Sequence, residues 1–118
     1  AMTGMVRDMV PNREAMRTAT ACGFPTATDL ADWLVREKEI PFREAHHITG
    51  RIVRLAEENK CLLADLDLAT LQQIDARIDK GVYDVLSLDA SVNSRISYGG
   101  TAPTNVRAAA AKARERFL

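Results

Sequence analysis

Apolar residues recur at helical spacing along most of the chain, and no segment alternates strictly enough for a strand. The clearest case is the segment 26–50, TATDLADWLVREKEIPFREAHHITG, together with the residues that follow it to position 58. One amphipathic helix has an apolar face made of Ala27, Leu30, Ala31 and Leu34. The next has an apolar face made of Phe42, Ala45, Ile48, Ile52 and Ala56. The pattern predicts two helices that pack on each other through these faces.

The connection between these two helices is short. Pro41 disfavours helical geometry at Ile40, so the first helix should end near Lys38, and Pro41 itself suits the first position of the second helix. Thr26 and Asp29 have the spacing of a capping box, which predicts that Thr26 caps the first helix. The two helices should therefore form an αα-hairpin or a corner.

The rest of the chain reads as shorter helices separated by turns. The predicted N-cap residues are Asn12, Asp67 and Ser87. Pro103 should begin the last helix, and Gly23 and the Tyr98-Gly99-Gly100 segment should mark breaks. Asp79-Lys80-Gly81 is predicted to be a turn.

Two of these helices, near the chain ends, should also have inner faces. That of the helix after Asn12 consists of Ala15, Met16, Ala19 and Cys22. That of the last helix consists of Val106, Ala109, Ala110, Ala113 and Phe117. Taken together, the pattern predicts a small orthogonal all-α domain of about six or seven helices, built from helix-turn-helix hairpins.

Composition narrows the class of protein. The 118 residues are enough for one domain with a modest core. Lys plus Arg and Asp plus Glu number 16 each, whereas nucleic-acid and membrane-surface proteins favour a basic excess, so neither partner is expected. There is no transmembrane run and no hydrophobic signal segment, and we expect a cytoplasmic protein. Cys22 and Cys61 match no metal or redox spacing and are interpreted as reduced thiols rather than a disulfide.

The adjacent histidines His46 and His47 are the first candidate for chemistry. Neighbours in a helix point about 100° apart, and a zinc site needs ligands at i and i+3 or i+4 with further Cys, Asp or Glu ligands. Glu44 and Glu58 are not so placed. We therefore predict no metal site. His46 should be buried at the edge of the apolar face, and His47 should be exposed beside Arg43.

Three further candidates have better structural interpretations. Ser91, Ser94 and Ser97 lie near Arg95, but no histidine is close in sequence and there is no G-x-S-x-G elbow, so capping and packing are favoured. Gly99-Gly100-Thr101 precedes a helix but lacks the lysine of a phosphate loop, and is interpreted as a structural break. The basic residues of the last helix form a solvated face, or a subunit contact as the minor alternative; they are Arg107, Lys112, Arg114 and Arg116. No catalytic, cofactor-binding or metal-binding residue is predicted.

Several separated motifs carry a family resemblance. TATDLADWLV…IPFREAHHITG closely resembles the C-terminal domain of argininosuccinate lyase, a member of the fumarase/aspartase superfamily. DLDLATLQQID, VYDVLSLDASVNSR and SYGGTAP fit the same family in the same order, so the resemblance runs from about Val10 to about Arg114. On this basis residues 10–118 are the C-terminal helical domain. Residues 1–9 are the remnant of a preceding helical domain or a tag, and Met5, Val6 and Met9 are expected to be severed contacts.

The resemblance implies an activity for the parent enzyme. Members of the family cleave argininosuccinate to arginine and fumarate in arginine biosynthesis, without a cofactor, and are homotetramers whose active sites take residues from three subunits. Their base is a serine on a mobile loop within a GSSxMPQKKNP-like signature, and this sequence contains no such signature. The chain alone is therefore predicted to be inactive, with the remaining domains of the same polypeptide as its partners. The alternative is a stand-alone helical interaction module with the same fold.

Overall fold

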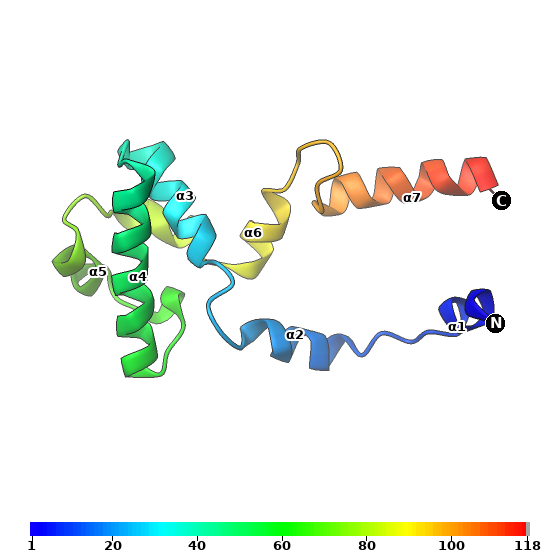
Figure 1. Cartoon of the computed structure of the whole chain (residues 1–118), viewed down its shortest axis with the longest axis horizontal. Coiled ribbons are helices and arrows are strands. Elements are labelled where there is room, and N and C mark those ends of the chain that lie inside the picture. Colours follow the sequence, from blue (N-terminus) through cyan, green and yellow to red (C-terminus); the bar gives the residue numbers. More distant parts are fainter. Residues whose placement is uncertain (118) are drawn as a thin grey trace.

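The computed structural model describes residues 1–117, except for the side chain of Ala21, and all regular structure in that range is helical (Figure 1). The elements are α1 (Met2–Arg7), α2 (Arg13–Ala21), α3 (Ala27–Lys38), α4 (Phe42–Asn59), the 3-10 helix η1 (Leu63–Asp65), α5 (Leu68–Ile74), the 3-10 helix η2 (Lys80–Asp84), α6 (Leu88–Asn93) and α7 (Pro103–Phe117). The predicted all-α fold is confirmed.

Helices α3 and α4 pack on each other and form the centre of the fold. Glu39 adopts the left-handed conformation, with φ of 53°, and the backbone N–H of Ile40 donates to the carbonyl of Leu34 at 3.3 Å. These features end α3 at Lys38, as the position of Pro41 predicted. Ile40 is buried between the two helices, so the short link itself contributes to the core.

The apolar faces of α3 and α4 are buried as expected, with one exception. The buried residues on these helices' apolar faces include Leu30, Ala31, Trp33, Leu34, Ala45, Ile48, Ile52 and Ala56. Phe42, however, is 62% exposed, so its assignment to the core face is wrong. Phe42 opens the first turn of α4, at the edge of the apolar stripe, where no preceding turn of the helix covers it. Its ring stacks instead on His46, with the centroids 6.2 Å apart.

The segment from η1 to α6 completes this core. Its buried side chains are Leu63, Leu66, Leu71, Ile78, Val82 and Leu86. The Tyr83 hydroxyl donates to the carbonyl of Leu66 at 2.7 Å, which ties η2 to the loop before α5. Burial raises the pKa of Tyr83, which keeps this hydroxyl a donor. The predicted N-caps Asn12, Asp67 and Ser87 are confirmed, because each side chain accepts a backbone N–H three residues ahead.

The predicted capping box at the start of α3 is wrong. Thr26 does occupy the N-cap position, but its side chain makes no capping hydrogen bond and its ψ of 3° differs from the extended geometry of a capping residue. Asp29, the expected partner, is turned towards α6 instead. Thr26 is only 5% exposed, so it contributes by packing rather than by capping.

Helices α1, α2 and α7 project away from the core, and α1 and the far end of α7 lie at the same end of the molecule (Figure 1). The molecule measures 55 × 29 × 22 Å along its principal axes. The predicted inner faces of α2 and α7 do not pack on the core: Met16 is 60% exposed and Phe117 is 72% exposed. The other residues assigned to these faces are also exposed, namely Ala15, Ala19, Cys22, Val106, Ala109, Ala110 and Ala113. The sequence predicted these two helices correctly, but nothing in the described chain packs against their apolar faces.

Candidate functional site

The most buried polar cluster joins the start of α3 to α6. Asp29 is 7% exposed, and its carboxylate accepts from the Ser91 hydroxyl at 2.7 Å and from the Arg95 guanidinium at 2.5 Å. Ser91 lies on α6 and Arg95 follows it, more than sixty residues along the chain from Asp29. The contact therefore anchors α6 on the hairpin of α3 and α4.

The same cluster fixes the break before α7. The Arg95 carbonyl accepts from the backbone N–H of Ala102 at 3.1 Å, and Ala102 is 1% exposed. Gly99 has a positive φ of 77°, which favours glycine. A Cβ at Gly100 would lie 2.2 Å from the Arg95 carbonyl oxygen, so only glycine fits there. The predicted structural break is confirmed, and it sets the direction in which α7 leaves the core.

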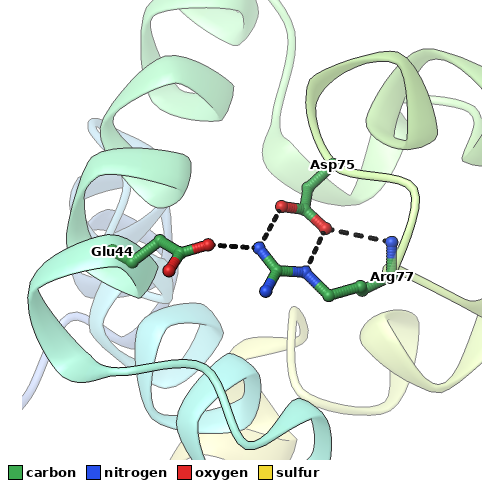
Figure 2. A network of polar contacts seen from close by, with 3 residues as sticks. All are labelled: Glu44, Asp75 and Arg77. Carbon is green, nitrogen blue, oxygen red and sulfur yellow. Dashed lines mark hydrogen bonds and ion pairs between the residues drawn. The ribbon is translucent and has the colours of Figure 1, made fainter.

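A second network holds the loop after α5 against α4 (Figure 2). The Arg77 guanidinium donates to Asp75 through Nε at 2.9 Å and through Nη2 at 2.7 Å, and it also donates to Glu44 on α4. The hydrogen bond from Arg77 holds the pKa of Asp75 below its ordinary value, and the two carboxylates raise the pKa of Arg77. Sequence reasoning missed this network. The D-x-R spacing of Asp75 and Arg77 was a signal for the local pair, but nothing indicated Glu44.

A third polar contact joins the end of α3 to η2. Lys38 donates to Asp79, and its ammonium lies 4.9 Å from the ring centroid of Trp33. Asp79 also accepts from the backbone N–H of Gly81 at 2.9 Å, so it caps η2. The hydrogen bond from Lys38 comes first among the causes that lower the pKa of Asp79. All three clusters join segments distant in sequence, and each carboxylate in them is already paired with a cation.

The histidines lie differently from the prediction. His47 is exposed, as expected, but His46 is exposed too, so its predicted burial is wrong. His46 lies beyond the edge of the buried stripe, on the side where Phe42 covers it by stacking. Within residues 1–117, no three side chains of His, Cys, Asp or Glu come together in a way that could hold a metal ion. Cys22 and Cys61 are free thiols.

Of the capping and packing predicted for the three serines, the structure shows packing by the Ser91 side chain and a local contact by the Ser94 side chain, whereas Ser97 contributes through its backbone carbonyl. Ser91 donates to Asp29, and the Ser94 hydroxyl donates to the carbonyl of Ser91 at 2.8 Å. The carbonyl of Ser97 accepts from the backbone N–H of Gly100 at 2.8 Å and from the side chain of Asn105 at 2.9 Å. Each hydroxyl or carbonyl named here is used in holding α6 and the following break in place.

A small concave site lies where α2 ends, beside η1 and α6. Its volume is about 70 Å³ and its walls are largely apolar, including Phe24, Leu63, Leu86 and Leu88. None of the residues that line it carries a titratable side chain. General acid–base chemistry needs such a group within hydrogen-bond reach of the reacting atom. This pocket suits an apolar side chain rather than a reacting substrate.

The projecting helices expose many of their apolar side chains. Large apolar side chains that are more than half exposed lie on or beside α1, α2 and α7: Met2, Met5, Val6, Met9, Val10, Met16, Val106 and Phe117. The basic residues of α7 are exposed as well, which agrees with the predicted solvated face. In the part of the chain that the structure describes, no helix is both long and apolar enough to cross a membrane. Apolar patches of this kind are typical of protein interfaces.

One comparison with known proteins identifies the family. The family model described as argininosuccinate lyase C-terminal matches residues 24–93, which is more than half of the chain. The matched range begins just before α3 and ends at the last residue of α6. It therefore contains the hairpin, the buried core apart from Ala102, and the three polar clusters apart from Arg95. The chain belongs to the argininosuccinate lyase C-terminal family.

Proposed function

We propose that this chain serves as the C-terminal structural domain of an argininosuccinate lyase, an enzyme that cleaves argininosuccinate to arginine and fumarate in arginine biosynthesis. The domain caps the central helical bundle of the enzyme and supports its subunit arrangement, a homotetramer in the cytoplasm. Its partners are the remaining domains of the same polypeptide. The catalytic serine loop belongs to those other domains, and neither a cofactor nor a metal takes part.

The observation that carries this proposal is the contrast between a packed core and three projecting helices. Residues 24–93 match the family and contain all of the buried core except Ala102. Outside that range, α1, α2 and α7 expose apolar side chains such as Met16 and Phe117. Exposed apolar surface on this scale is unfavourable in water, and burial against another domain would remove it. Residues 1–9 then form the end of the preceding helical domain.

The polar groups of the chain also favour a structural role. An elimination catalyst needs a base and an anion site for the developing negative charge, held together in one pocket. Here Asp29, Asp75 and Asp79 are each bound to a cation that ties two elements together. The apolar pocket beside η1 has no such group. These residues therefore account for the fold, and the chemistry falls to the rest of the enzyme.

Complementation tests this proposal. An argininosuccinate lyase lacking its C-terminal domain is mixed with the purified chain, and fumarate formation is followed. We expect the chain to restore turnover. Met16→Asp should abolish the restoration while leaving the urea midpoint of the chain unchanged, because Met16 is 60% exposed and lies on the α2 face assigned to docking. Asp32→Ala, on α3 within the core hairpin, is the matched control and should complement normally. Failure of the unsubstituted chain to restore turnover would contradict the proposal.

The alternative is a stand-alone helical interaction module with the same fold. The exposed α1, α2 and α7 faces would then bind a different protein. Complementation distinguishes the lyase domain from the interaction module. A module that binds a different protein would not restore lyase turnover, so Met16→Asp would have no restoration to abolish.

A further inference from the structure

A groove lies between the second half of α4 and α5, two helices that contact each other (Figure 1). Its volume is about 460 Å³, which is within the range of small-molecule sites in proteins. It shares no residue with the apolar pocket beside η1, and its lining is different in kind, because α4 supplies three charged side chains. These are Arg51, Arg54 and Glu58.

The two arginines have no counter-ion in the fold. Arg51 and Arg54 are three residues apart on α4, so they are neighbours on the helix surface and their charges repel each other. Within residues 1–117, neither guanidinium lies within ion-pair distance of a carboxylate. The cations that hold the core together, Lys38, Arg77 and Arg95, are each paired with one. The groove therefore holds positive charge that the fold itself does not use.

The carboxylates near the groove leave part of this charge unbalanced. The pKa of Asp75 is lowered first by its hydrogen bond from Arg77 and to a smaller extent by the charge of Arg51, so this carboxylate is already occupied. Glu58 is the one carboxylate that lines the groove, and it makes no ion pair within the described chain. With two arginines and one glutamate, the lining has a net charge of +1. A ligand of net charge −1 that carries both signs would balance every charged group.

The remaining walls suit the rest of such a ligand. Leu55 on α4 and Ile74 on α5 are half-buried against the core, and both line the groove, where they can cover aliphatic carbons. Gln73, exposed on α5, adds an amide that can donate to a carboxylate. Arginine is the side chain best suited to carboxylate recognition, because its planar guanidinium can donate two parallel hydrogen bonds.

We propose that the groove between α4 and α5 binds a free acidic amino acid. Its two carboxylates pair with Arg51 and Arg54, its ammonium group pairs with Glu58, and its methylene groups lie over Leu55 and Ile74. Each charged group of the ligand then meets the opposite charge, and each charged side chain of the groove gains the partner that the fold does not provide. This site is independent of the proposed docking through α1, α2 and α7.

An NMR titration of the full 118-residue chain with sodium L-glutamate tests the site. The glutamate replaces sodium chloride at constant ionic strength, so that a general salt effect does not mimic binding. We expect saturable shifts of backbone amides in α4 and α5, with a dissociation constant of about 5 mM, as suits a small ligand in an open groove. L-glutamine lacks the second carboxylate and N-acetyl-L-glutamate lacks the ammonium group, so each should bind about fivefold more weakly.

Substitutions assign the contacts. Arg51→Ala and Arg54→Ala should each raise the dissociation constant for L-glutamate about fivefold. Arg43→Ala is the matched control, because Arg43 is an exposed arginine on the same helix outside the groove, and it should change nothing. Glu58→Gln should weaken L-glutamate by a similar factor and leave N-acetyl-L-glutamate no weaker, since only the first ligand carries an ammonium group. All four positions are exposed, so the urea midpoints should not change.

Two results would overturn the proposal. One is the absence of saturable shifts up to about 50 mM L-glutamate, ten times the expected dissociation constant. The other is a dissociation constant that is the same for all three ligands or is unaffected by the two groove arginines. Either result would contradict the groove site without bearing on the lyase role, which complementation tests separately.

Discussion

Replacing Asp29 by alanine removes the contact on which the placement of α6 depends. The carboxylate is 7% exposed and accepts two hydrogen bonds, from Ser91 at 2.7 Å and from Arg95 at 2.5 Å. The substitution leaves a half-buried hydroxyl without its acceptor. It also leaves a guanidinium without its counter-ion, although the Arg95 side chain is 45% exposed and water can solvate it.

The magnitude follows from these two contacts. A hydrogen bond to a charged group contributes about 1.5 kcal/mol at the low end of its range, and a pair with one exposed partner contributes only about 0.5 kcal/mol. Asp29→Ala should therefore lower the free energy of unfolding by about 2 kcal/mol. With a urea dependence of about 2 kcal/mol per molar, the denaturation midpoint falls by about 1 M. Asp29→Asn keeps one acceptor oxygen, so its denaturation midpoint should lie between those of Asp29→Ala and the unsubstituted chain.

Asp32→Ala is the matched control, since it makes the same change on the same helix at a residue outside the cluster, and it should cost less than about 0.5 kcal/mol. A double-mutant cycle with Arg95→Ala isolates the ion pair and should give a coupling energy of about 0.5 kcal/mol or more. Equal midpoints for Asp29→Ala and Asp32→Ala would refute the reasoning, because α6 would then be held by its apolar contacts alone.

Three further changes test other parts of the account. Ile52→Ala, at a fully buried position in the middle of α4, should cost about 2–5 kcal/mol in urea denaturation, and a loss near zero would place the stripe outside the core. Thr26→Val should change the free energy of unfolding by less than about 0.5 kcal/mol, because the Thr26 hydroxyl makes no capping hydrogen bond. A loss of about 1 kcal/mol, as is typical when a capping side chain is removed, would show that Thr26 does cap α3. Asp75→Asn should destabilise the chain at neutral pH. Because the folded state lowers the pKa of Asp75, its stabilisation is present above the ordinary value of 3.8 and is lost as pH falls through the folded value. The difference between this variant and the unsubstituted chain should therefore narrow in acid, and an unchanged difference below pH 3.8 would argue against the ion pair.

The features that the sequence predicted best are those with local causes. Asn12, Asp67 and Ser87 cap the helices that follow them, because a capping side chain needs only the backbone three residues ahead. Pro41 fixes the end of α3 for a similarly local reason. The apolar periodicity of α3 and α4 likewise identified most of the core, since both helices are long enough for the period to be clear.

The errors have long-range or end-of-helix causes. Asp29 was assigned to a cap because Thr26 lies three residues before it, whereas its true partners, Ser91 and Arg95, come more than sixty residues later and no spacing reveals them. Phe42 and His46 were predicted to lie on or beside the buried face of α4 because the apolar periodicity of the helix was extended into its first turn. The other elements of the core do not reach that turn, and the two rings stack on each other instead.

The faces of α2 and α7 present a different problem. Their apolar patterns predict burial, and the described chain provides nothing to bury them. A periodic pattern reports that a helix has a packing partner, but it does not say whether that partner lies in the same domain. The proposed partner of these faces, the rest of a lyase, is inferred from the family that residues 24–93 match. Apolar periodicity alone does not identify it.

The central claim is that this chain supports a lyase without being a catalyst, and an activity measurement on the purified chain tests it most directly. Argininosuccinate is added to the folded chain, and fumarate absorbance is followed against a sample without protein. We expect no turnover above background, because the serine loop signature is absent from the sequence and the apolar pocket beside η1 has no titratable side chain that could act as a base. Turnover that rises with the concentration of the chain and survives further purification would contradict it.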